Sequence, residues 1–258
     1  MPYKKLIETY AKELSSRARP CNMGEGIDKL ATIDMSDHKE SVDREALQAR
    51  RKMLGDLHPD TLILIGNMGQ LLKKMGKPEE AKPLYEEALR GRRKKLGYRH
   101  PSTLASINNL GDLLKDMGQL EEARPLLEEA LQARRSTLGV RHPKTLASIS
   151  NMGQLLQAMG QLEEARPLYE EALKFKRETL SDHHPNTLIS IGNMGSLLEK
   201  QGLLAEAIPL FTEELKGLVL LRGMEYQGTR ASANHLVKLL RNAGQLDKAK
   251  ALAATHDV

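Results

Sequence analysis

Histidine is the side chain of this sequence best suited to bind a metal, and four histidines recur at a fixed step. They precede proline at His58, His100, His142 and His184, 42 residues apart. Zinc is held by nitrogen atoms at about 2 Å, so its ligands must lie close together. One histidine per unit, each at the start of a helix, sets neighbouring rings roughly 8–10 Å apart. We therefore expect no metal, and we assign these residues to packing at helix starts.

Acidic pairs are the next candidates for chemistry, because two carboxylates can act as general acid and base. Glu86–Glu87 and Glu128–Glu129 are neighbours in sequence, and neighbouring helical residues point about 100° apart. They fit solvated helix faces with contacts to Arg and Lys one turn away. The sequence also lacks a glycine-rich phosphate loop and a G-x-S-x-G motif. We expect no enzymatic activity and no cofactor.

The composition narrows the remaining classes of function. Only 3% of the 258 residues are aromatic, which leaves few rings to stack on nucleic-acid bases. The single cysteine, Cys21, excludes an internal disulfide and fits a reducing compartment. Apolar runs are short, whereas a membrane-spanning helix needs about 20 residues. We expect a cytoplasmic protein, and an organelle stays open because basic residues occur on the amphipathic segment near the N-terminus.

The 42-residue step predicts two helices per unit. Proline suits the first helical position after each of the four histidines. The first helix should end at a glycine, which tolerates positive φ; these glycines are Gly76, Gly118, Gly160, Gly202 and Gly244. The second helix should begin with acids and close on bases such as 92–95 and 134–135, matching the helix dipole. We interpret these basic runs as a solvated face, with a nucleic-acid surface as the alternative.

Small residues at fixed places indicate close helix packing. Gly69, Gly111, Gly153 and Gly195 recur on the first helix. Alanines recur on the second helix, at Ala81, Ala123, Ala165, Ala207 and Ala249. One helix pair cannot bury its apolar faces alone, whereas stacked pairs can. The fold class that follows is all-α, a solenoid of antiparallel helix pairs.

The motifs now described resemble tetratricopeptide repeats, specifically the 42-residue kinesin-light-chain or nephrocystin-3 type. The resemblance is carried by H-P-x-T-L, Asn109-Leu110-Gly111, Met117-Gly118, Glu122-Ala123-x-Pro125-Leu126 and Ala130-Leu131. It implies a right-handed superhelix. The expected divisions are an N-terminal capping helix and connector (1–37), a degenerate half repeat (38–57), four repeats (58–99, 100–141, 142–183, 184–225) and a truncated C-terminal repeat (226–258).

A row of amides is the candidate binding site. Asparagine recurs at Asn67, Asn109, Asn151 and Asn193, and His235 takes the place in the fifth unit. Each amide offers a donor and an acceptor, so a row of them can pair with the backbone of an extended peptide. The resemblance implies that this helix face lines a concave groove. The alternative is that the asparagines bond a neighbouring helix and keep the repeats in register.

Residues around this row would select the ligand. The candidates are Gln70, Lys73, Lys74, Asn108, Asp112, Lys115, Gln154 and Lys238. The same stripe carries six cations, including Lys200 and Arg241, against the three acids Asp112, Asp116 and Glu199. A mildly basic groove favours an acidic or carboxylate-bearing peptide.

The fourth unit departs from the pattern. Glu214 replaces a recurrent alanine, Arg222 replaces a leucine, and Leu218, Leu220 and Leu221 add apolar surface. Terminal units of solenoids are often atypical because they cap the stack. Capping is one interpretation, and a partner or self-association surface at these leucines is the other.

These observations predict a non-enzymatic scaffold that binds an extended peptide or partner segment in its groove. The partner would be a protein or peptide and not a nucleic acid, and we expect no membrane span. Kinesin light chains use such repeats to bind cargo adaptors, but no long heptad segment is present here, so motor association is not implied. The alternative function is a structural subunit docked through its ends or convex surface.

Overall fold

The computed structural model of this chain describes residues 35–256. Every regular element in that range is a helix. The expected capping helix near the N-terminus lies outside the described residues. The first described helix, α3 (Met35–Leu54), begins within the stretch that we expected to be a connector. Residues from Leu47 onward form one compact unit, and the described residues before Leu47 do not belong to it.

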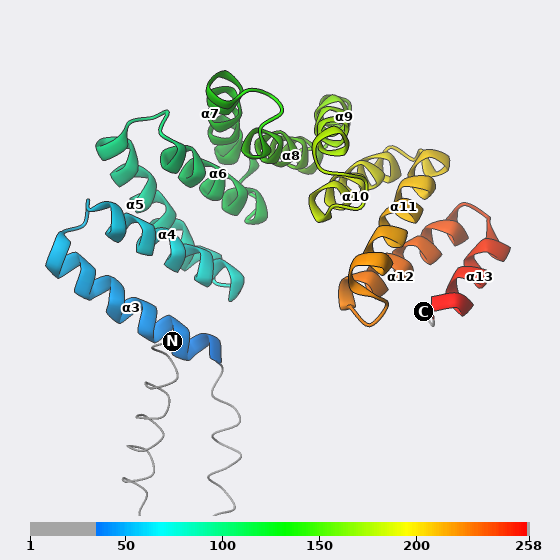
Figure 1. Cartoon of the computed structure of the whole chain (residues 1–258), viewed down its shortest axis with the longest axis horizontal. Helices are drawn as coiled ribbons and strands as arrows, with labels where there is room; N and C mark the ends of the chain where they lie inside the picture. The colour runs from blue at the N-terminus through cyan, green and yellow to red at the C-terminus, as the bar shows by residue number, and fades with distance from the viewer. Residues whose placement is uncertain (1–34, 257–258) are drawn as a thin grey trace, which may run out of the picture. The chain divides into compact units, whose positions relative to one another are not determined.

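Ten helices follow α3, in five pairs. They are α4 (Pro59–Lys74), α5 (Pro78–Leu96), α6 (Pro101–Asp116), α7 (Leu120–Leu138), α8 (Pro143–Ala158), α9 (Leu162–Thr179), α10 (Pro185–Lys200), α11 (Leu204–Arg222), α12 (Gln227–Asn242) and α13 (Leu246–His256). Each packs chiefly on its neighbours in sequence. Within the unit that starts at Leu47, the even-numbered helices lie on the inner side of an arc and the odd-numbered helices on the outer side (Figure 1). The all-α solenoid is confirmed.

The recurring histidines cap the inner helices. In all four, the imidazole Nδ1 accepts a hydrogen bond from the backbone N–H two residues later, at 3.1–3.2 Å. This bond satisfies one of the N–H groups that a helix start leaves without an intrahelical partner. The histidines therefore act at helix starts, as the sequence indicated. Among residues 35–256, no group of three or more His, Cys, Asp or Glu could hold a metal.

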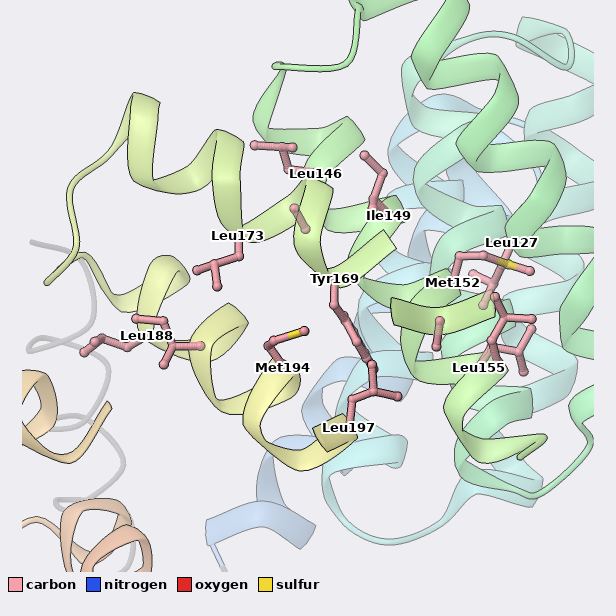
Figure 2. Packing of buried hydrophobic residues seen from close by; sticks show 14 of the residues in the cluster. Leu127, Leu146, Ile149, Met152, Leu155, Tyr169, Leu173, Leu188, Met194 and Leu197 are labelled. Carbon is pink, nitrogen blue, oxygen red and sulfur yellow. The ribbon is translucent and has the colours of Figure 1, made fainter. Parts of the chain in front are cut away.

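Glycines end the inner helices and also permit their close contact with the outer ones. The five glycines expected at helix ends have φ between 73° and 78°. Gly111 serves the second purpose, because a Cβ there would lie 2.7 Å from Cδ2 of Leu127. Gly153 lies in the same way against the ring of Tyr169. Figure 2 shows Tyr169 among apolar side chains of the three consecutive helices α8, α9 and α10.

Candidate peptide-binding surface

The four recurring asparagines lie on inner helices. Asn67 and Asn109 are exposed, whereas Asn151 and Asn193 are half-buried. Each inner helix packs its buried face on its neighbours, and the outer side is occupied by the odd-numbered helices (Figure 1). The less buried face therefore lies toward the inner side of the arc. Within the described part of the chain, none of the four amides has a hydrogen-bond partner, and the Nδ2 atom of Asn193 is buried without one.

Polar side chains beside this row bond to one another across repeat boundaries. The Lys73 ammonium binds Asp112 and also Asp116, the latter at 2.7 Å. In the next repeat, Lys115 donates to Gln154 at 2.9 Å. The contact recurs as Gln157 Nε2 donating to Ser196 at 3.2 Å. We call the contacts Lys73–Asp112, Lys115–Gln154 and Gln157–Ser196 the inner ladder, and each joins residues 39 positions apart.

The inner ladder changes the charge that is free to meet a ligand. Burial alone would raise the pKa of Asp112, but the ammonium groups of Lys73 and Lys115 hold it below its ordinary value. Two of the six cations expected in the groove are thus engaged by the protein's own carboxylates. The other four make no ion pair with any described residue: Lys74, Lys200, Lys238 and Arg241.

Asn108 and His235 differ from the four asparagines in having partners. The amide oxygen of Asn108 accepts from the Arg134 guanidinium at 3.5 Å and from Ser148 at 3.4 Å. Asn108 therefore belongs to a contact between helices. The His235 ring lies 2.8 Å from a carboxylate oxygen of Glu199 and packs edge-on against Phe211.

A buried cation links successive repeats, and this corrects one expectation from the sequence. Arg134 is only 5% exposed. Its guanidinium donates to the Ser148 hydroxyl at 2.6 Å and to two backbone carbonyls, those of Leu104 and Lys144. Arg92 makes the equivalent bonds one repeat earlier. These residues belong to the basic runs that we expected on a solvated face; that interpretation was wrong for them.

Lysine takes the same place in the third repeat. Lys176 is 7% exposed and donates to the hydroxyls of Ser150 and Ser190 at 3.2 and 2.7 Å. Burial lowers its pKa to about 8. The sequence does hold a signal for this contact, because a serine recurs 14 residues after each cation, at Ser106, Ser148 and Ser190.

The outer helices are joined by ion pairs between residues 36 positions apart. An arginine near the end of one outer helix pairs with a glutamate in the middle of the next. These pairs, which we call the outer ladder, are Arg51–Glu87, Arg93–Glu129, Arg135–Glu171 and Arg177–Glu213. From the sequence we expected such acids to contact only bases on their own helix, and these pairs between successive outer helices were not predicted.

The fourth repeat lacks the buried cation. Leu218 stands where Arg92, Arg134 and Lys176 stand in the earlier repeats. Glu214, one turn earlier on α11, directs its carboxylate against the backbone of Gly192, where a Cβ would lie 2.4 Å from Oε1. Burial raises the pKa of Glu214, and nearby His235 and Ser232 offset part of this increase. The buried Ser232 hydroxyl has no hydrogen bond of ordinary geometry within residues 35–256.

The three leucines expected to form a contact surface do not share one environment. Leu220 is 70% exposed and Leu221 is 42% exposed. Leu218 is half-buried and packs against the core. Any contact surface on this part of α11 therefore rests on Leu220 and Leu221.

Comparison with known proteins points to one family. The sequence model of the tetratricopeptide repeat matches residues 40–94, 102–178 and 145–218. No curated protein sequence gives a significant match. Within residues 35–256, no helix is both long enough and apolar enough to cross a membrane.

Solved structures show the same architecture. One is a kinesin-light-chain-type protein with nearly identical TPR-like repeats from Podosopora anserina. It is 29% identical, covers 76% of this chain and 93% of its own, and has a TM-score of 0.66. BtubC (BKLC) from P. vanneervenii is 19% identical, with coverages of 86% and 90% and a TM-score of 0.72. MamA from Desulfovibrio magneticus is 16% identical, with coverages of 75% and 92% and a TM-score of 0.52. The last two show the fold alone.

Proposed function

Because the chain belongs to the tetratricopeptide repeat family, whose fold is a scaffold for protein–protein interactions, we propose that it binds an extended segment of a partner protein along its inner side. The amides of Asn67, Asn109, Asn151 and Asn193 would bind the backbone of that segment. The observation that carries this proposal is that these four amides lack partners among the described residues, while the polar side chains beside them bond to each other.

The spacing of the row suits an extended chain. Successive helix layers lie roughly 8–10 Å apart. An extended peptide rises about 3.3 Å per residue. One asparagine would then meet the peptide backbone about every third residue. A constant amide suits a constant ligand feature, whereas the variable neighbours Gln70, Asp112, Gln154 and Ser196 suit side-chain selection.

Two apolar side chains flank the row on the same helix face. Ile63 is 49% exposed and Ile189 is 55% exposed, three repeats apart. Alanine takes this place between them, at Ala105 and Ala147. Three layers span about 24–30 Å, which is the length of about seven to nine extended residues. The ligand would therefore carry two apolar side chains at about that separation.

The remaining charge favours acidic groups in the ligand. Lys74, Lys200, Lys238 and Arg241 have no ion pair within the described residues. Asp112 and Asp116 are already paired with Lys73. An acidic or carboxylate-bearing segment would thus meet cations that no carboxylate of the described structure neutralises.

The test uses a synthetic acidic peptide with two leucines about eight residues apart, titrated against the full chain. Asn109→Ala combined with Asn151→Ala should weaken binding about tenfold or more, since each neutral hydrogen bond contributes about 0.5–1.5 kcal/mol. Gln132→Ala, on an exposed position of outer helix α7, is the matched control and should leave the affinity unchanged. The thermal melting curve should be the same for all three proteins.

Two outcomes contradict the proposal. One is unchanged affinity in the asparagine variant. The other is a lowered melting temperature with full affinity, which would make the asparagines residues that keep the repeats in register.

A further inference from the structure

A second surface of the molecule has the properties of a docking site, and it lies on outer helices. A cavity of about 750 Å³ is bounded by α11 and α13, with α12 beneath it. Its apolar lining includes Ile208, Leu236, Leu240 and Leu252. None of the four asparagines of the row is among the residues that line this cavity.

The equivalent place two repeats earlier is smaller and more polar. The cavity bounded by α7, α8 and α9 has a volume of about 400 Å³. Arg124 and Arg135 line it, and Arg135 reaches across to Glu171 on α9. A second contact across the same place runs from Arg124 to Gln161, at 3.4 Å. Charged side chains thus cross the space between those outer helices.

Three substitutions in the repeat pattern remove these side chains at the last boundary. Ile208 stands where Lys82, Arg124 and Arg166 stand. Val219 replaces the arginine of the outer ladder, and Thr255 replaces its glutamate. Both partners of the ladder are therefore missing between α11 and α13, and the space they fill elsewhere is left apolar.

The rim of the cavity is basic. Lys216 on α11 and Lys248 on α13 line it, and neither makes an ion pair with a described residue. Glu213, the lining acid, is engaged by Arg177 at 2.7 Å. Leu220, 70% exposed, follows Lys216 by one turn on α11 and extends the apolar surface beyond the cavity. From Ile208 to Leu220 a helix rises about 18 Å, or about three turns.

From this geometry we propose that the cavity between α11 and α13 binds an amphipathic helix of a partner protein. This helix would carry acidic residues beside its apolar stripe. A groove between two helices accepts the ridges of a third. Apolar side chains one turn apart would enter between Ile208 and Leu252, and carboxylates would reach Lys216 and Lys248. This site does not depend on the asparagine row.

The test compares two synthetic helical peptides of about three turns with the same leucine stripe. One carries glutamates beside the stripe and the other carries lysines. The full chain should bind the acidic peptide at least tenfold more tightly, with methyl NMR shifts at Ile208, Leu236 and Leu252.

The decisive variant rebuilds the pattern of the earlier repeats: Ile208→Arg, Val219→Arg and Thr255→Glu together. It should weaken binding of the acidic peptide at least tenfold without lowering the melting temperature. Ala251→Arg, a single change at an exposed lining residue, serves if the triple variant does not fold. Asn109→Ala with Asn151→Ala should leave this binding unchanged, which separates the site from the inner surface.

The proposal fails if neither peptide binds at millimolar concentration, if both bind equally, or if the folded variants keep full affinity. It also fails if the unmodified chain self-associates in sedimentation and the rebuilt variant is monomeric, because the occupant is then a second copy. Lys216→Glu with Lys248→Glu should reverse the preference between the two peptides.

Discussion

The first three boundaries between repeats and the last one are packed by different side chains. At the first three, a buried or half-buried cation from the outer helix bonds to both neighbouring inner helices. Lys176 does so through two serine hydroxyls, whereas the two arginines bond one serine hydroxyl and backbone carbonyls. At the last boundary, Leu218 occupies the cation's place, and the carboxylate of Glu214 lies against Gly192. The outer ladder also ends there, at Val219 and Thr255.

The difference shows where a solenoid can lose polar contacts between repeats at little cost in stability. Each repeat contacts only its neighbours, so a weakened boundary at one end costs the rest of the array little. The same change in the middle would divide the array. The loss of polar contacts coincides with the largest cavity described above, between α11 and α13. The departures from the repeat pattern at this end therefore fit a surface between α11 and α13 that is left open to a partner.

The largest expected effect is a loss of stability from overpacking in the repeats that keep the regular pattern. Gly111→Leu places a side chain where even a Cβ would lie 2.7 Å from Leu127. Overpacking of this kind costs typically 1–3 kcal/mol, and we expect a loss of about 3 kcal/mol here. Urea denaturation measures the loss. Asn109→Ala, on the same helix but exposed, is the control. An unchanged midpoint for Gly111→Leu would mean that α6 and α7 separate without cost.

The second prediction exchanges the two kinds of boundary. Arg134→Leu leaves the Ser148 hydroxyl and two carbonyls without their donor, and should cost about 2 kcal/mol. The reverse change, Leu218→Arg, should cost much less, because Ser232 and Glu214 can both accept from the new guanidinium. Equal losses for the two variants, in the same denaturation experiment, would contradict the view that the last boundary retains acceptors for a cation.

The sequence predicted the repeat architecture because that architecture depends on local signals. Proline and glycine mark the helix ends, and small residues such as Gly111 mark the contacts between helices. The ladders were missed because their partners lie 36 or 39 residues apart, and which base meets which acid depends on how successive helix pairs are rotated. Arg134 was misplaced because charge alone suggests exposure, whereas its hydrogen-bond partners come from two different repeats.

The third prediction concerns pH at the third boundary. The pKa of Lys176 is about 8, below its ordinary value of 10.5, because the ammonium is buried. Between these values the unfolded chain binds a proton there that the folded chain does not. The free-energy cost of burying this ammonium is therefore fully present below about pH 8. The cost falls, and the stability of the fold rises, as the pH increases from about 8 to about 10.5.

Lys176→Met isolates this contribution from other groups that titrate in the same range. The variant should be more stable than the parent by about 1 kcal/mol at pH 7, because an apolar side chain of similar length replaces a buried charge. The difference in the free energy of unfolding between this variant and the parent should become smaller by pH 10. Lys176→Arg, which restores the residue type of Arg134, stays charged across this range, so the difference between the Met and Arg variants should not change with pH. A constant difference between the Met variant and the parent across this range would show that Lys176 is not held in a charge-disfavouring site.

The smallest expected effect distinguishes two members of the asparagine row. The Nδ2 atom of Asn193 is buried without an acceptor among the described residues, whereas Asn109 is exposed. Removing a buried unpaired group relieves its desolvation cost, so Asn193→Ala should be neutral or stabilising by a few tenths of a kcal/mol, up to about 1. Asn109→Ala should change stability by less than about 0.5 kcal/mol, as is usual for surface positions. Both variants should nevertheless bind less tightly the acidic peptide with two leucines about eight residues apart, which is the ligand proposed for the inner side. If Asn193→Ala instead destabilises the fold by more than 1 kcal/mol, Asn193 keeps α10 in register, and the binding role would rest on the exposed members of the row.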